Sequence, residues 1–176
     1  MDNQQTNIFI VSAEDENVRI RIPRTVLPGI KTIQDMLDDI SVSDNEPSSI
    51  PVPRVLDQKS LDLVLEYMNY DAENPISEEL KTGQKVQFSK WETEFFSRLE
   101  SLTEQPYLFQ LISITNYLNY NRLFHTSCYK VASMIEGKTP DQIRETFGLP
   151  DDLTEEEKEK LYIESGLRPA FSKAAT

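Results

Sequence analysis

The chain has 176 residues, enough for one hydrophobic core and an appendage, and its 30 acidic and 18 basic side chains give a formal net charge of -12 at pH 7. This charge repels nucleic-acid phosphates and anionic membrane surfaces, so proteins are the expected partners. The single cysteine, Cys128, and the single histidine, His125, exclude an internal disulfide framework and the usual zinc site of nitrogen and sulfur ligands, and no apolar run reaches the roughly 20 residues of a membrane span.

The N-terminal third predicts a β-hairpin, a helix and a short edge strand. Apolar residues at 8–11 and alternating apolar and basic residues at 18–23 flank an acidic turn at 14–17, as in two paired strands with one buried face. Residues at helical spacing follow, namely Ile33, Met36, Leu37 and Ile40. Because proline has no backbone N–H, Pro51 and Pro53 confine the run at 50–53 to a sheet edge.

A second helix and a loop are predicted next. One apolar stripe at helical spacing consists of Leu61, Val64, Leu65 and Met68. Residues 71–90 are rich in Asp, Glu, Asn, Pro, Ser, Gly and Lys and show no periodicity. We interpret them as a solvated, flexible loop, most simply a spacer without chemistry.

Three helices are predicted between residues 91 and 137. The first has a stripe of Trp91, Phe95, Phe96 and Leu99. The second is apolar on nearly every face between 108 and 118, which is typical of a central, buried helix. The third ends at Gly137, a suitable residue after a helix C-terminus. Its stripe consists of Leu123, Phe124, Cys128, Val131, Ala132 and Ile135.

Two helix starts are well specified in the last part of the chain. Thr139 with Gln142, and Thr154 with Glu157, have the spacing of capping boxes, in which each side chain bonds the other residue's backbone N–H. The apolar residues nearby are too few to fold two short helices unaided. They are Ile143, Phe147, Leu149, Leu153, Leu161, Tyr162, Ile163 and Leu167. We therefore expect this segment to dock onto a partner as well as onto its own domain.

The run VASMIEGKTPDQIRETF at 131–147 resembles the signature of the S-phase kinase-associated adaptor family, whose members join F-box proteins to a cullin in SCF ubiquitin ligases. The resemblance extends, in chain order, to residues 30–39, 50–53, 91–95, 116–118 and 152–157. It implies an α/β fold class, in which a BTB/POZ domain, a small sheet with helices, spans 7–137. An F-box-binding extension of two helices follows at 138–167, with a disordered N-terminus at 1–6 and a tail at 168–176.

The resemblance implies a non-catalytic adaptor in the cytoplasm and the nucleus, with a cullin and F-box proteins as partners. Asn116 and Tyr117 match residues of the family that contact the cullin. The residues expected to face the F-box receptor, or to support its groove, are Ile143, Phe147, Leu149, Leu153, Leu161 and Ile163. Apolar anchors in such a groove supply most of the affinity, while acidic side chains around it steer and select.

No catalytic, cofactor or metal site is expected. The sequence has no Gly-rich phosphate-binding loop, and no residues combine into a credible Ser-His-Asp catalytic triad. Cys128 lies on an apolar stripe and is interpreted as a buried structural thiol, and His125 as an ordinary surface or boundary residue. The sequence leaves open whether Tyr117 is a core residue or an exposed cullin contact.

Two other functions stay open at this point. One is an F-box-binding structural scaffold outside ubiquitination, for instance at kinetochores or endosomes, whose cullin surface is idle. The other is an adaptor similar to elongin C, although elongin C ends before the two capped helices. Whether the unpartnered chain forms a weak homodimer is also left open.

The sequence departs from the family pattern in three places. Members commonly end in a Glu-Asn-x-Trp stretch whose Trp packs against the F-box, whereas residues 164–169 read ESGLRP. Either Phe171 or Tyr162 replaces that anchor, or the range of receptors is narrower. The stretch 99–106 is about three residues longer than in most relatives. Pro150 stiffens the link between the last two helices.

Overall fold

Two compact units make up the chain. We describe them from a computed structural model that covers residues 5–30, 33, 35, 48–75 and 87–165. The first unit runs from Met1 to Ala132 and the second unit from Ser133 to Thr176. Among the described residues, every buried apolar side chain except Met134 belongs to the first unit. The core that the structure describes is therefore essentially that of the first unit.

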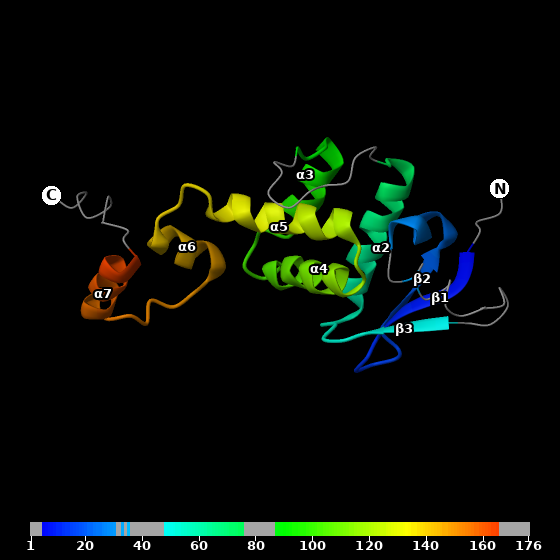
Figure 1. Cartoon of the computed structure of the whole chain (residues 1–176), viewed down its shortest axis with the longest axis horizontal. Coiled ribbons are helices and arrows are strands. Elements are labelled where there is room, and N and C mark those ends of the chain that lie inside the picture. Colours follow the sequence, from blue (N-terminus) through cyan, green and yellow to red (C-terminus); the bar gives the residue numbers. More distant parts are fainter. Residues whose placement is uncertain (1–4, 31–32, 34, 36–47, 76–86, 166–176) are drawn as a thin grey trace. The chain divides into compact units, whose positions relative to one another are not determined.

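Three strands of the first unit form a sheet in the order β2-β1-β3 (Figure 1). They are β1 (Gln5–Ser12), β2 (Arg19–Pro23) and β3 (Ser48–Val52). β1 is antiparallel to β2 and parallel to β3, and Ile10 lies opposite both Ile20 and Ile50. Because side chains alternate between the two faces of a strand, these three isoleucines are buried together on one face. The predicted hairpin and the edge position of the proline-containing strand are confirmed.

A short 3-10 helix, η1 (Arg24–Gly29), follows β2. The helix predicted from the apolar spacing of residues 33–40 lies largely outside the described residues. Of the four side chains that suggested it, only Ile33 is described, and it is buried.

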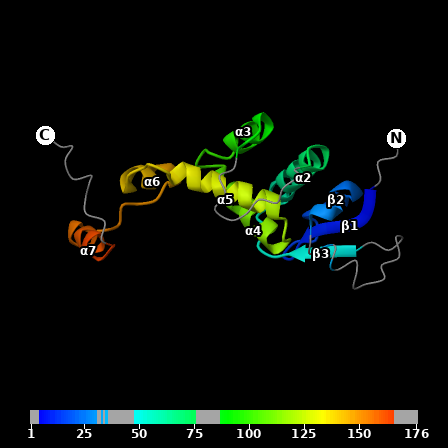
Figure 2. The same cartoon turned by 45° about the horizontal axis from the view of Figure 1, so that its top comes forward.

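Helix α2 (Gln58–Glu73) packs against β2 and helix α4 (Figure 2). It begins at Asp57, whose carboxylate accepts a hydrogen bond from the Ser60 N–H at 3.1 Å. The predicted stripe is largely inside, because Leu61, Val64 and Met68 are buried.

The prediction of a loop at 71–90 is wrong at both ends of that range. Helix α2 continues through Glu73, and Ser89 caps helix α3 (Lys90–Ser97) in a capping box with Glu92. The Ser89 hydroxyl accepts from the Glu92 N–H at 3.0 Å, and the Glu92 carboxylate accepts from the Ser89 N–H at 2.9 Å. Residues 76–86, the middle of that prediction, lie outside the described residues.

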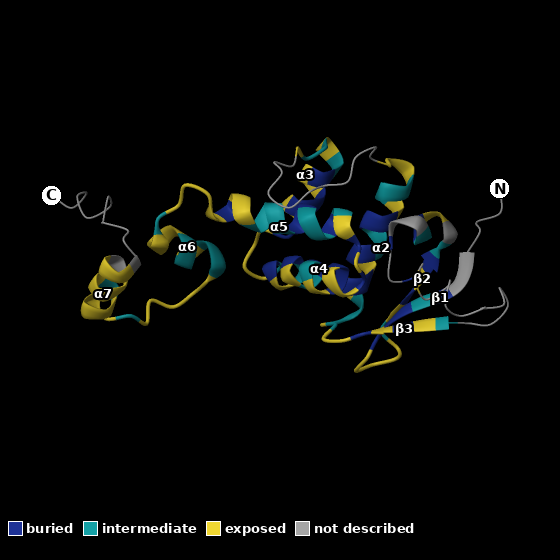
Figure 3. Cartoon of the chain, viewed as in Figure 1, coloured by how far each residue is buried: buried dark blue, intermediate teal, exposed yellow. Residues whose placement is uncertain are grey.

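The other two long helices of this region are α4 (Gln105–Tyr117) and α5 (Asn121–Ile135), which lie side by side in both views (Figures 1 and 2). The prediction that the helix at 108–118 is buried on all faces is wrong. Leu108, Leu111 and Ile114 are buried, but Phe109 and Tyr117 are exposed, so α4 has one buried and one exposed side (Figure 3). Packing neighbours cover only part of its apolar surface.

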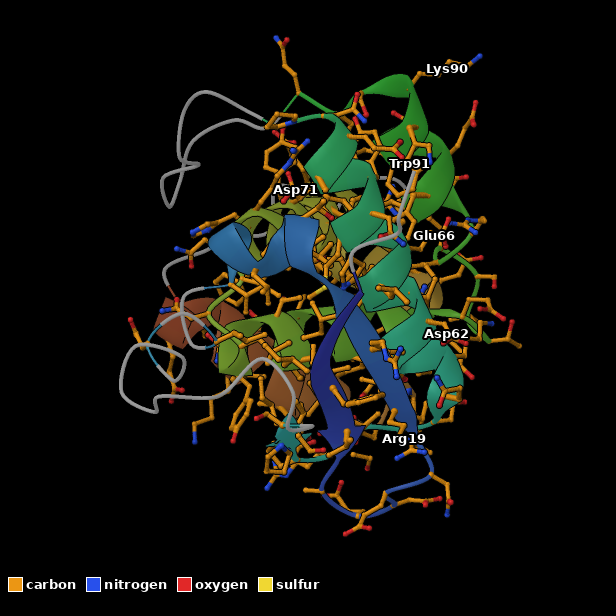
Figure 4. All side chains as sticks on the ribbon, turned by 90° about the vertical axis from the view of Figure 1, so that its right-hand side faces the viewer. Arg19, Asp62, Glu66, Asp71, Lys90 and Trp91 are labelled. Atoms are coloured by element: carbon orange, nitrogen blue, oxygen red, sulfur yellow. The ribbon has the colours of Figure 1, made fainter. Side chains whose placement is uncertain are left out.

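An aromatic stack joins α2 to α3 in the first unit. The Trp91 ring lies 4.1 Å from the Tyr70 ring, nearly parallel to it at 5°, and 5.0 Å from the Phe95 ring. Figure 4 shows Trp91 facing α2, the helix that carries Asp62, Glu66 and Asp71. Stacked aromatic pairs add to the stability that burial of their surface provides.

A polar cluster, which we call the Arg122 cluster, joins α2, α3 and α5 beside this stack. The Arg122 guanidinium donates to the Asp71 carboxylate and lies 3.5 Å from that of Glu92. Tyr67 donates to Glu92 at 2.6 Å, and Tyr120 donates to Asp71. The Arg122 side chain is only 10% exposed, so its charge is largely removed from water and its ionic partners compensate for that loss.

The surroundings of the Arg122 cluster shift the pKa of its members. Burial raises the pKa of the Tyr67 and Tyr120 hydroxyls, and the carboxylates they donate to act in the same direction. Burial alone would also raise the pKa of Glu92, but the hydrogen bonds from Tyr67 and Ser89 and the charge of Arg122 outweigh it. The pKa of Glu92 therefore lies below its usual value, and Glu92 stays ionised beside the arginine at neutral pH.

Ser127 on α5 is fully buried, and its hydroxyl has no hydrogen-bond partner among the described residues. We expect Ser127→Ala to leave the free energy of unfolding unchanged or to raise it by up to about 1 kcal/mol, because an unsatisfied hydroxyl is removed and alanine favours helix. Urea denaturation measures the change. The matched control is Thr126→Val, since the Thr126 hydroxyl donates to the Arg122 carbonyl at 2.6 Å, and its loss should cost about 1 kcal/mol. Equal destabilisation by both variants would contradict this expectation.

The second unit contains α6 (Pro140–Phe147) and α7 (Glu155–Ser165). Both predicted capping boxes are confirmed. The Thr139 and Thr154 hydroxyls each accept a hydrogen bond at 3.3 Å from the N–H three residues on, and the side chains of Gln142 and Glu157 accept from the threonine N–H groups at 2.9 Å. Gly148, at φ 62°, ends α6 in the left-handed conformation that glycine adopts without strain.

Candidate functional site

The exposed side of α4 is the first candidate surface. Phe109, Ser113, Asn116 and Tyr117 are all exposed, and their spacing places them along one side of the helix. We call these four residues the α4 face. Tyr117 is 47% exposed, so the question that the sequence left open is answered in favour of a surface residue. Phe109 and Tyr117 are large aromatic side chains exposed about two helical turns apart on this side of α4, and exposed apolar side chains grouped on one face are characteristic of an interaction surface.

Leu56 adjoins this face and was not predicted from the sequence. The Leu56 N–H donates to Oε1 of Gln110 at 3.1 Å, and Gln110 precedes Tyr117 by two helical turns on the same stripe. The next residue, Asp57, accepts from the Tyr107 hydroxyl at 2.8 Å, so the segment runs along α4. Leu56 is 56% exposed. No local pattern could have found it, because the contact joins residues 54 positions apart.

The second candidate surface lies on α6, on α7 and between them. Ile143, Phe147 and Leu153 are half-buried, and Leu149, Leu161 and Ile163 are exposed. The structure thus places all six predicted receptor residues within the second unit with part of their surface in contact with water. Of these, Ile163 is 71% exposed, which is unusual for a large apolar side chain on a helix without a partner.

Cys128 and His125 have ordinary surroundings in the first unit. Cys128 is half-buried, and burial raises the pKa of its thiol, so the thiol is protonated and poorly nucleophilic at neutral pH. The His125 ring packs edge-on against Phe124. Within the described ranges, His, Cys, Asp and Glu side chains form no group of three or more that could hold a metal ion. None of the helices described here is long and apolar enough to cross a membrane.

The fold and these surfaces define a protein-binding module. A small α/β unit presents one exposed aromatic face, and a helical unit, in which Met134 is the one buried apolar side chain among the described residues, presents exposed leucine and isoleucine side chains. Surfaces of this kind become buried in complexes with other proteins.

Comparison with known proteins identifies the family. Residues 121–165 match the Skp1 family, dimerisation domain. The chain is 36% identical over 160 residues to SKP1-like protein 12 of Arabidopsis thaliana, covering 89% of this chain and 94% of the relative. It is 32% identical over 168 residues to the S-phase kinase-associated protein 1 homolog of Tetrahymena thermophila, covering 94% and 95%. It is 31% identical over 169 residues to the E3 ubiquitin ligase complex SCF subunit sconC of Arthroderma benhamiae, covering 94% and 97%. The chain belongs to the Skp1 family.

Proposed function

We propose that this chain is the adaptor subunit of an SCF ubiquitin ligase, which bridges the N-terminal domain of a cullin to F-box receptors and catalyses no reaction itself. The observation that carries the proposal is its similarity, over nearly the whole chain, to relatives named as SCF subunits. As part of the same proposal we assign residues 7–137 to the BTB/POZ fold and residues 138–167 to the receptor-binding extension. The adaptor works in the cytoplasm and the nucleus.

The cullin is proposed to dock on the α4 face. Asn116 and Tyr117 match the cullin contact of the family, and both side chains are exposed. A tyrosine at such a position supplies a large, rigid contact area with a polar end, which is why tyrosine is enriched at interfaces.

The F-box receptor is proposed to dock on the second unit. The residues proposed to contact the receptor are Ile143, Phe147, Leu149, Leu153, Leu161 and Ile163. Their incomplete burial supports the assignment, since a receptor that covers them gains apolar burial that the free chain lacks. The presence of α6 and α7 favours this function over that of an elongin-C-like adaptor. The match to a dimerisation domain supports a weak homodimer of the unpartnered chain.

Affinity capture from the organism's own cell extract, followed by mass spectrometry, tests the proposal. Recovery of a cullin together with several F-box proteins is the expected result. F-box proteins without any cullin would instead support the scaffold outside ubiquitination, and recovery of neither would contradict the proposal. The F-box domain of a captured receptor then serves as the ligand in binding measurements.

We expect Phe147→Ala to weaken binding of that F-box domain by about 2 kcal/mol or more, because Phe147 and Ile143 lie four residues apart on one side of α6 and act as apolar anchors. Isothermal titration calorimetry measures the loss. The control is Glu145→Ala, which truncates an exposed side chain of the same helix and should change the affinity little. Equal affinities of the two variants, with helix content unchanged by circular dichroism, would mean that α6 does not face the receptor.

A further inference from the structure

The side chains of helix α7 that the structure describes bury little apolar surface. None of its side chains that the structure describes is buried, and Leu161 and Ile163 are exposed (Figure 3). A helix of this length is not stable without contacts, and burial of apolar surface usually provides them. Polar contacts therefore have an unusually large part in fixing the direction of α7 relative to α6.

Asp151, in the linker between the two helices, makes such contacts with both. Its Oδ2 lies 2.8 Å from Nζ of Lys158 on α7, and its Oδ1 lies 3.7 Å from Nε of Arg144 on α6. The Lys158 and Arg144 side chains are each only 20% exposed, so their stems lie along the protein surface and their charges converge on this carboxylate. One residue thus links the two helices.

Two neighbouring carboxylates do not make this link. Asp141 pairs with Arg144, and Glu155 pairs with Lys158, each within three residues along its own helix. The Asp141 and Glu155 side chains are 86% and 90% exposed. They support the cations locally and leave the angle between the helices unrestrained. The hydrogen bond and charge of Lys158 also lower the pKa of Asp151, so the link is ionised at neutral pH.

We propose that Asp151 is a positioning residue for receptor binding, whose ion pairs to Arg144 and Lys158 hold α7 at a fixed direction relative to α6. The inference rests on the proposed function, in which apolar side chains of both helices meet one F-box domain. Anchors on two helices engage one partner at a lower entropic cost when the helices are already oriented. Because salt screens exposed ion pairs, the receptor affinity depends on ionic strength through this residue.

The test compares Asp151→Asn with Asp152→Asn in the full chain. Both variants remove one negative charge from the same linker, but the exposed Asp152 side chain takes part in none of the ion pairs that the structure describes. Amide hydrogen exchange at 155–165 in the free chain is expected to be roughly fivefold faster in Asp151→Asn, the size expected when such an ion pair is lost. It stays at the wild-type rate in Asp152→Asn. The affinity for the captured F-box domain falls by a similar factor in Asp151→Asn alone.

Salt and a conservative variant separate positioning from general loss of structure. At about 1 M salt, where the Debye length is roughly 3 Å, the wild type and Asp151→Asn are expected to converge in both exchange and affinity. Asp151→Glu, which keeps the charge, is expected to retain most of the protection at low salt. Equal exchange in the two asparagine variants would overturn the inference. If no F-box domain binds the wild type, the proposed function fails, and exchange in the free chain still decides whether Asp151 orients α7.

Discussion

We expect the double substitution Asn116→Lys with Tyr117→Lys to abolish cullin binding and to leave F-box binding intact. Both side chains are exposed, so the variant should fold as the wild type does. Docking a cullin on the α4 face would then bury two ammonium groups without partners, at a cost of several kcal/mol. That cost is enough to remove an interaction of micromolar affinity or tighter from a normal binding assay. Size-exclusion chromatography with a cullin N-terminal domain and with a captured F-box domain gives both readings.

A matched variant controls for the added charge. Asn69→Lys with Ser97→Lys places the same two charges at exposed positions of two other helices, α2 and α3, and should bind the cullin normally. Normal cullin binding by the Asn116 and Tyr117 variant would refute the cullin assignment of this face. The scaffold outside ubiquitination would then be favoured if F-box binding persists.

The second large effect is expected from Arg122→Ala, which should lower the free energy of unfolding by about 3–5 kcal/mol. The substitution removes the cation that pairs with both the buried Glu92 carboxylate and the largely buried Asp71 carboxylate. Each side chain is less than a fifth exposed, so water cannot replace the lost partner at little cost. Urea denaturation followed by circular dichroism measures the change.

An exposed arginine of the same unit serves as the comparison. Arg98 pairs with Glu66 at 2.7 Å, but the side chains are 52% and 40% exposed, and such pairs contribute about 1 kcal/mol or less. Arg98→Ala should therefore cost only a fraction of the loss in Arg122→Ala. If the two variants were equally stable, the Arg122 cluster would not be a main connection between α2, α3 and α5.

Features that depend on neighbours in the sequence could be predicted. The hairpin follows from an apolar run at 8–11 and an alternating run at 18–23 on either side of a short acidic turn, and the capping boxes at Thr139 and Thr154 follow from side chains three residues apart. The excess of apolar side chains in the last segment was visible in the sequence, and the resemblance to the adaptor family then singled out six of them as candidate receptor residues. Their role in binding stays a prediction.

Features that depend on distant partners could not be predicted. Asp71 was interpreted as part of a loop because its neighbours are polar, yet its contacts with Tyr120 and Arg122, about fifty residues away, lie in the folded first unit. The Ser89–Glu92 capping box was a local signal that the low periodicity of its surroundings obscured. The apolar composition of α4 could not tell which side the rest of the unit covers. For the same reason the place of Leu56 beside α4 required the structure.

The stack of Tyr70, Trp91 and Phe95 has a consequence for measuring these effects. Trp91 is the single tryptophan of the sequence, and it lies within the first unit. Its emission reports solvent entry between α2 and α3, whereas far-ultraviolet ellipticity sums over all helices, including α6 and α7. A thermal melt recorded by both signals therefore separates the two units within one sample: the transition common to both belongs to the first unit, and ellipticity lost outside it belongs to the second.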